Sequence, residues 1–191
     1  MVKKRINLKT QLISFICFLL LFPACAYPVR YDGPYKGKII DAETGAPIEG
    51  VVVLGVWSKV AVSPGGGVSS YYDAKETLTD KNGEFEIQGL GIKILSSVAP
   101  MNVLIFKSGY QYIDGPWESH KYDGGLMKNK AKVEGDRVIF PIRKLTMEER
   151  KKQLGPPAPP DEAPKKRIEL ILKEINRDRA EQGLDSIDVG R

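Results

Sequence analysis

Two short stretches carry the side chains that metal binding or acid–base catalysis would require. In "TLTDKNGEFEI" (77–87), Asp80, Asn82 and Glu84 place oxygen side chains at alternate positions, as a calcium loop does. Such a loop also needs a bidentate acid at its twelfth position, and counting from Asp80 that position is Gly91. An apolar alternation typical of a strand resumes directly after Glu84. The stretch therefore predicts a tight turn between two strands and no metal site.

In this turn the side chains of Asp80 and Asn82 would accept hydrogen bonds from nearby backbone amides, and Gly83 would take the left-handed conformation. The flanking residues then alternate between a core face and a solvent face. Leu78, Phe85 and Ile87 are expected in the core, and Thr77, Thr79, Glu84 and Glu86 in solvent.

The second stretch surrounds His120, the one histidine of the chain, in "PWESHKYDGG" (116–125). Ser119 and Asp123 are close in sequence, but adjacent residues on an extended segment point in opposite directions, and a Ser-His-Asp relay needs convergence in space. We interpret His120 as a solvated loop residue. The chain also has no glycine-rich phosphate loop followed by lysine and no Cys/His spacing for zinc. The sequence predicts no cofactor and a protein that is not an enzyme.

Aromatic residues gather in the segment 108–125. The candidate ligand-binding aromatics there are Tyr110, Tyr112, Trp117 and Tyr122. Rings on loops can stack against sugars or anchor a protein partner. The alternative is that Tyr110 and Trp117 cover the end of a β-sandwich. Trp57 lies within an apolar strand and is expected in the core.

These residues must be positioned by a β-rich body. Short β-branched or alternating segments recur at 35–41, 50–62, 75–80, 83–88, 101–107, 131–134 and 137–143. Gly, Asn and Asp punctuate them, as in the hairpin turn expected at 134–136, and "SPGGGVSS" (63–70) has the composition of a flexible loop. Many short strands with such turns are typical of a mainly β sandwich or barrel.

Three ordered blocks resemble the carboxypeptidase regulatory-like domain: "GKIIDAETGAPIEG" (37–50) with the valines that follow, "TLTDKNGEFEI" (77–87) and "VLIFKSGYQ" (103–111). The matching residues are Asp41, Thr44, Gly45, Pro47, Ile48, Gly50 and Val51, then Thr79, Asp80, Gly83, Phe85 and Ile87, then Gly109 and Tyr110. The resemblance implies a seven-stranded, transthyretin- or Ig-like antiparallel β-sandwich over 35–145. It also implies a non-catalytic module often found in exported or surface proteins. Insertions at 60–74 and 111–130 depart from the family pattern.

The chain changes character after Leu145. Thr146 and Glu149 form a capping box that predicts a short helix over 146–154. Five prolines then fall within 155–164, which predicts a stiff, extended linker.

A second helix is predicted over 165–183, with the residues 184–191 as a frayed tail. Its apolar residues follow a helical spacing, at Ile168, Ile171, Leu172 and Ile175. This narrow stripe predicts either that the helix folds back onto its own sandwich or that it docks on a partner.

Most of the net positive charge lies at the start of the chain. There are 29 basic and 24 acidic residues, but four of the basic ones lie in the first nine positions, where no acid occurs. The remaining chain is close to neutral and lacks a basic cluster interleaved with aromatics, so nucleic-acid binding is excluded.

The segment 1–24 has the order of a secretory signal. Its basic start precedes an apolar run over 12–22, which is about half the length that spans a bilayer. Small residues follow, so we expect an exported protein whose residues 25–34 form an exposed lead-in.

The signal can be processed by two routes. The motif Ala24-x-Ala26 suits ordinary cleavage, whereas "FPAC" (22–25) resembles a bacterial lipobox with Phe22 and Pro23 as departures. Cys17 is lost by either route, which would leave Cys25 alone in an oxidising compartment. Lipidation of Cys25 accounts for that thiol. We therefore expect a membrane anchor on the periplasmic or cell-surface side, with secretion as the alternative.

These inferences favour a structural or protein-interaction module of the cell envelope, with an envelope protein or polysaccharide as the partner. The alternative is carbohydrate binding through the aromatics of 108–125.

Intact mass spectrometry of the mature protein tests the anchor. We expect a diacylated or triacylated Cys25 at the N-terminus. An unmodified chain that begins at Tyr27 would instead show a secreted protein.

Overall fold

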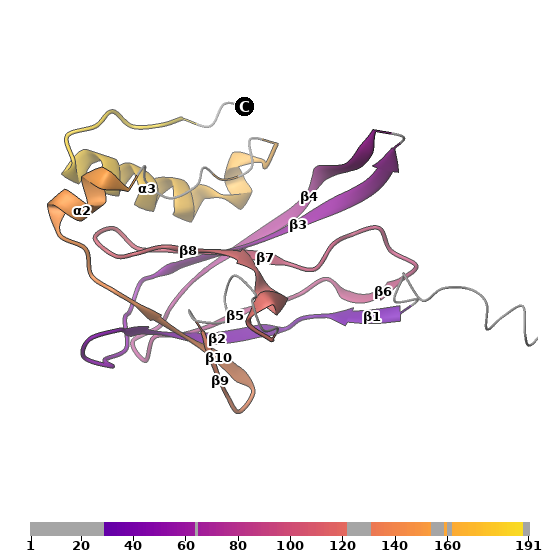
Figure 1. Cartoon of the computed structure of the whole chain (residues 1–191), viewed down its shortest axis with the longest axis horizontal. Coiled ribbons are helices and arrows are strands. Elements are labelled where there is room, and N and C mark those ends of the chain that lie inside the picture. The colour runs from indigo at the N-terminus through magenta and orange to yellow at the C-terminus, as the bar shows by residue number, and fades with distance from the viewer. Residues whose placement is uncertain (1–28, 64, 122–130, 154–158, 160–161, 189–191) are drawn as a thin grey trace, which may run out of the picture.

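The computed structural model describes residues 29–63, 65–121, 131–153, 159 and 162–188 (Figure 1). The predictions for segment 1–24, Cys25 and Tyr122 fall outside these residues.

The described chain is mainly β, as predicted, but it has ten strands where seven were expected. The strands are β1 (Val29–Asp32), β2 (Tyr35–Asp41), β3 (Val52–Ser63), β4 (Gly66–Leu78), β5 (Glu84–Ile87), β6 (Gly91–Ile94), β7 (Asn102–Phe106), β8 (Ile113–Pro116), β9 (Lys132–Glu134) and β10 (Arg137–Ile142). The helical segments are η1 (Trp117–Lys121), α2 (Met147–Lys152), η2 (Lys165–Arg167) and α3 (Glu169–Glu181). The three unpredicted strands are β1, β6 and β8.

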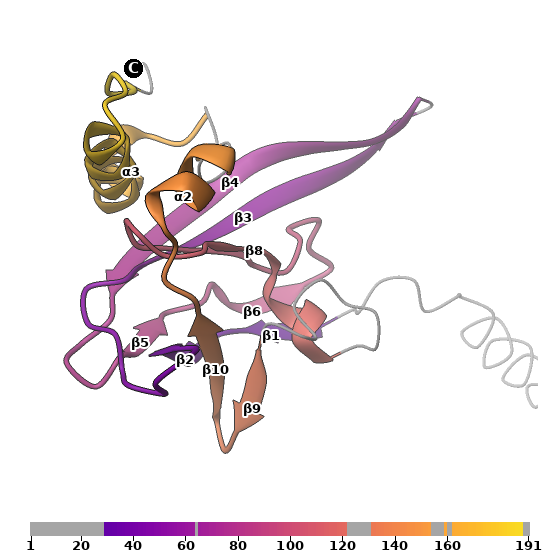
Figure 2. The ribbon, with the colours of Figure 1, turned by 60° about the vertical axis from the view of Figure 1, so that its left-hand side comes forward.

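The strands form two four-stranded sheets and a two-stranded ribbon. One sheet has the order β5-β2-β10-β9, the other β4-β3-β7-β8, and β1 pairs with β6 (Figures 1 and 2). The prediction of a wholly antiparallel sandwich is wrong at one ladder, since β2 and β10 are parallel. A long connection separates these two strands in sequence, so no hairpin forces them to run in opposite directions.

The two four-stranded sheets face each other across one apolar core. Its aromatic centre consists of Tyr35, Phe85, Trp117 and Phe140, whose neighbouring ring centroids lie 5.4–6.5 Å apart. Gly37 lies beneath the Phe85 ring, where a Cβ atom would come within 2.5 Å of it. Only glycine therefore lets β2 approach the centre of the sandwich so closely.

The sheet β4-β3-β7-β8 is also covered on its outer face, by α3 (Figure 2). Successive residues of β3 serve the two layers: Val53 faces the sandwich core, whereas Val52 and Leu54 pack against Ile171 and its neighbours on α3. Burial on both faces explains why β3 is a continuous apolar run and does not alternate. The apolar stripe of the helix is therefore occupied within its own chain, and the hypothesis that this stripe docks on a partner is wrong.

The turn predicted after β4 is confirmed. The Asp80 Oδ1 atom accepts hydrogen bonds from the amides of Asn82 and Glu84, both at 2.8 Å, and Gly83 has a φ of 72°. One carboxylate oxygen of Asp80 is thus engaged by the main chain.

The predicted facing of the residues before this turn is wrong. Leu78 is 47% exposed, whereas Thr79 is 3% exposed. The Thr79 hydroxyl donates to the carbonyl oxygen of Ile48 at 2.7 Å and accepts from the amide of Val51 at 2.9 Å. These two buried main-chain groups need a polar partner, which a leucine would not provide.

Two segments predicted as irregular form strands. Residues 66–70 of the expected loop 63–70 belong to β4, which pairs with β3 as far as Ser63↔Gly66. The lead-in contains β1, whose Asp32 is buried and accepts from the Trp57 indole nitrogen at 2.9 Å. In both segments pairing with a neighbouring strand overrides the local composition.

The two predicted C-terminal helices are confirmed, whereas the prediction of a frayed tail is wrong at Ile187. The capping box of Thr146 and Glu149 lies at the start of α2. The helix α3 ends shortly before Gly183, whose φ is 73°. Most of the predicted linker lies outside the described residues, but Ala163 is buried beneath α3. Ile187 is held in place because its amide and carbonyl both bond the side-chain amide of Asn176, at 2.7 and 2.9 Å.

The packing of α3 on the outer face of the sheet can be tested by mutation. Replacing the fully buried Ile171 by Ala should lower the free energy of unfolding by about 2–5 kcal/mol, because it leaves a cavity between α3 and the sheet. Lys173→Ala on the exposed side of the same helix should change it by less than about 0.5 kcal/mol. Urea unfolding measures both, and equal values would contradict a packed third layer.

Candidate functional site

The aromatics of segment 108–125 do not form an exposed platform in the described part of the chain. Trp117 is 5% exposed and packs edge-on against Tyr35 and Phe85 in the sandwich core. Tyr110 and Tyr112 are half-buried, the first against the sandwich core and the second against the apolar cluster beneath α3. Trp117 is therefore a core residue, and it offers no ring face to a ligand.

A polar cluster lies beside these tyrosines and ties α2 to α3. The Arg150 Nη2 atom lies 2.6 Å from Asp178 Oδ1 and 2.9 Å from Glu181 Oε2, and it also donates to the Ser108 hydroxyl at 3.1 Å. A hydrogen bond from Ser108, together with Arg150, holds the pKa of the Glu181 carboxyl below its usual value. The adjoining cavity is about 10 Å³, which is too small for a substrate. Most of these groups bond one another, so the cluster is structural.

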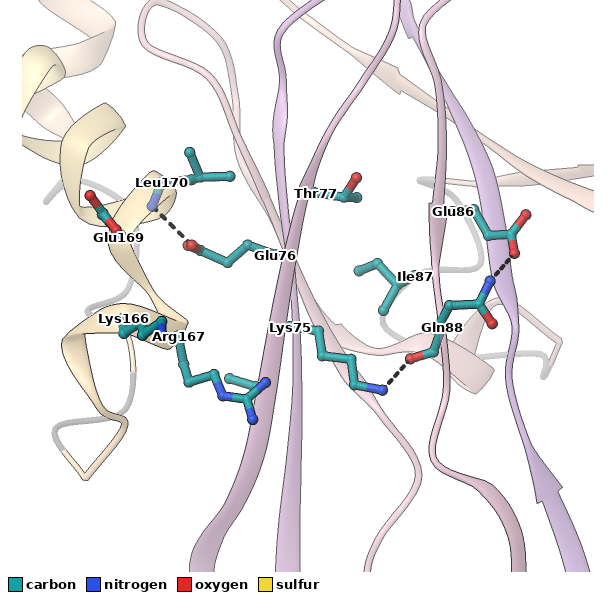
Figure 3. Close-up of a pocket in the computed structure, with 11 residues that line it drawn as sticks. Lys75, Glu76, Thr77, Glu86, Ile87, Gln88, Lys166, Arg167, Glu169 and Leu170 are labelled. Carbon is teal, nitrogen blue, oxygen red and sulfur yellow. Dashed lines mark hydrogen bonds between the residues drawn. The ribbon is translucent and has the colours of Figure 1, made fainter.

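A groove of about 510 Å³ lies along the open edge of the sandwich (Figure 3). Residues 74–77 of β4 run through it, residues 86–88 at the end of β5 form one wall, and η2 with the start of α3 forms the other. The strands β4 and β5 are each the outermost strand of their sheet. The groove therefore follows a strand edge that no further strand of the described chain covers.

Lys75 joins the two sheets across this groove. Its Nζ atom donates to the carbonyl oxygens of Gln88 and Gly89, at 2.8 and 3.0 Å, and lies 5.6 Å from the centre of the Trp57 ring. The ammonium group thus bonds main-chain oxygens of the facing strand wall. This bridge fixes the distance between β4 and the strand wall.

Glu76 points the opposite way and fixes the helical wall (Figure 3). Its carboxylate oxygens accept from the amides of Leu170 and Ile171, at 2.9 and 2.8 Å. The residue that precedes α3, Ile168, has no side chain able to cap the helix, so Glu76 performs this function from a distant strand. Burial raises the pKa of the Glu76 carboxyl, and the bonds from the two amides oppose that rise.

The remaining side chains give the groove two differently charged walls. Lys166 and Arg167 lie on the helical wall, and Arg167 is 3.7 Å from Asp73 Oδ1. Glu86 lies on the strand wall beside the Gln88 side-chain amide. The groove thus combines a strand edge with charges of both signs, an arrangement suited to binding an extended polypeptide.

Sequence reasoning missed this groove. Lys75 and Glu76 are ordinary strand residues in the sequence, and Lys166 and Arg167 precede a helix about 90 positions later. The one available signal was the poor capping residue before α3, which shows that the helix needs an acceptor from elsewhere.

Within the residues that the structure describes, no group of three or more His, Cys, Asp or Glu side chains is placed to hold a metal ion. No helix of the described ranges is long and apolar enough to cross a membrane.

No family model matches the chain, and neither the curated proteins nor the solved structures contain a match. The resemblance to the carboxypeptidase regulatory-like domain thus stays a prediction from three sequence blocks.

The role of Glu76 can be tested by hydrogen exchange. Glu76→Ala should lower the protection of the Leu170 and Ile171 amides and cost about 1–2 kcal/mol of stability, as other lost helix caps do. Glu86→Ala on the facing wall is the matched control. If both variants exchange like the wild type at the start of α3, another group caps the helix.

Proposed function

We propose that this chain is a non-catalytic lipoprotein of the cell envelope whose sandwich acts as a protein-interaction module. Its binding site is the groove along residues 74–77 of β4, and its ligand is an extended segment of another envelope protein. The observation that supports this proposal most is the uncovered edge of β4 between two polar walls.

The edge would recognise its ligand by strand addition. Among the described strands none lies on the outer side of β4, so its main-chain groups can pair with an extended peptide. Four residues of strand cover about 13 Å, which corresponds to a short peptide core. The Ala74 amide at the start of this stretch already donates to the Asp73 side chain at 2.9 Å, and just beyond it the Tyr71 amide donates to Glu162 at 3.0 Å. These two bonds limit the free edge on that side.

The walls would select the side chains of the ligand. Successive side chains of an added strand point to opposite faces of the sheet. Acidic side chains would therefore meet Lys166 and Arg167 on one wall, while basic ones would meet Glu86 on the other. A segment that alternates acidic and basic residues fits this arrangement.

The envelope location is supported by the sequence. Segment 1–24 has the features of an export signal, and Cys25 follows it in a lipobox-like setting. The resemblance to a module of exported proteins agrees with this location. Carbohydrate binding has less support, because Trp117 is in the core and Tyr110 and Tyr112 are half-buried.

Photo-cross-linking in the native envelope tests the binding site. A photoreactive amino acid at Gln88, on the exposed part of the strand wall, should give a discrete, protease-sensitive adduct. The same amino acid at Thr44, exposed on a loop outside the groove, should not. Adding Lys166→Glu and Arg167→Glu should reduce the adduct several-fold if acidic side chains bind this wall.

Two outcomes would contradict the proposal. Equal adducts at both positions would show non-specific contact, and a protease-resistant polysaccharide adduct would favour the carbohydrate alternative.

A further inference from the structure

The β1–β6 ribbon has the reverse of the polarity expected at a protein surface. Its outward side chains are Val29 and Tyr31 on β1 and Ile92 and Ile94 on β6, and each is between 59% and 70% exposed. The register places Val29 opposite Ile94 and Tyr31 opposite Ile92, so the four side chains form one continuous patch. We call this patch, with the adjoining Leu95, the apolar ribbon face.

The charged side chains of the ribbon point inward instead. Arg30 donates to the carbonyl oxygen of Ala99 at 3.0 Å and lies 3.3 Å from Asp32. The Lys93 Nζ atom lies 5.5 Å from the centre of the Tyr72 ring. A ribbon exposed only to water would place its charges outside and its isoleucines inside.

The ribbon is held rigidly to the sandwich in this orientation. Asp32 is buried, and its Oδ1 atom accepts from the Trp57 indole nitrogen at 2.9 Å and from the Leu90 amide at 3.1 Å. The chain after β6 bends at Leu95, which is 77% exposed with a φ of 45°, a conformation that leucine seldom adopts. The apolar ribbon face is therefore a fixed surface that no other part of the described chain covers.

We propose that the apolar ribbon face inserts into the surface of the membrane that carries the lipid anchor. This inference rests on the proposed function, since it takes Cys25 to be acylated. Val29 lies four positions after Cys25, and four extended residues span at most about 14 Å. Acyl chains on Cys25 would therefore hold the start of β1 within that distance of the lipid headgroups.

The charges at this end of the molecule also suit a lipid surface. The segments 51–72 and 89–113, which supply the neighbouring arm of β3 and β4 and all of β6, contain no acidic residue. Lys59 and Lys93 lie over the half-exposed Tyr72 ring, at 5.1 and 5.5 Å from its centre. Tyrosine and lysine beside aliphatic side chains are typical of the boundary between headgroups and acyl chains.

The ribbon lies on the side of the sandwich away from α2 and α3 (Figures 1 and 2). Insertion would leave the helical end of the molecule facing away from the membrane. A second copy of the chain fits the ribbon less well, because a stable protein interface uses about 20–30 residues on each side and this patch has five side chains.

Tryptophan quenching measures the insertion. Ile92→Trp places a tryptophan on the apolar ribbon face, and Leu184→Trp places one at an exposed apolar position beyond α3. Both mature proteins are reconstituted in vesicles of phosphatidylethanolamine and phosphatidylglycerol with brominated acyl chains. Trp57 and Trp117 are buried in the core and give the same background in both.

We expect the emission of Ile92→Trp to shift to the blue and to be quenched at least three-fold more than that of Leu184→Trp. Equal quenching in the two variants would overturn the proposal. Conversion of a dimer to a monomer by Ile92→Asp would also overturn it, because the face would then contact a second copy. Unchanged thermal unfolding of each variant shows that the fold is kept.

The mass of the protein in the same preparation shows whether Cys25 is acylated. It therefore distinguishes failure of the insertion from failure of the proposed function. If Cys25 is acylated but the tryptophan emission of the Ile92→Trp variant is that of a water-exposed ring, the lipoprotein proposal stands and the insertion proposal is refuted. If Cys25 is unmodified, the lipoprotein proposal fails, and vesicle flotation then tests the ribbon alone. Binding that falls at least ten-fold in the Ile92→Asp/Ile94→Asp double variant would support the ribbon, and no binding by the parent protein would refute it.

Discussion

The structure depends on one sheet, β4-β3-β7-β8, whose two faces are both covered by apolar side chains. Alternate residues of β3 face the opposite sheet and α3, so a single strand serves two interfaces. Each interface excludes water from the same main-chain ladder. This double burial fixes the position of α3. Because the start of α3 forms the helical wall of the groove, it also fixes that wall. Polar contacts then fix the helix at both ends, through Glu76 at its start and Arg150 near its end.

The parts of the fold that could be predicted have local causes. The capping box of α2, the hairpin turn at Gly135 and the turn at Asp80 each depend on residues a few positions apart. The apolar spacing of α3 is also a local pattern, although it did not reveal whether the helix packs on its own sheet or on a partner.

The parts that could not be predicted depend on contacts between distant residues. Short strands such as β1 and β6 have weak patterns of their own and exist because they pair with each other. The groove requires Glu76 to meet an amide 94 positions away. Trp117 was a candidate ligand-binding residue because its neighbours resemble a loop. It is a core residue because the chain after β8 turns inward over Tyr35 and Phe85.

The cover that α3 provides has a consequence for the growing polypeptide. The outer face of the sheet includes Val52 and Leu54, but the isoleucines that shield it lie more than about 110 positions later. During synthesis these isoleucines are made after every strand of the sheet, so the outer face of the sheet can be covered only once the C-terminal helix has been added.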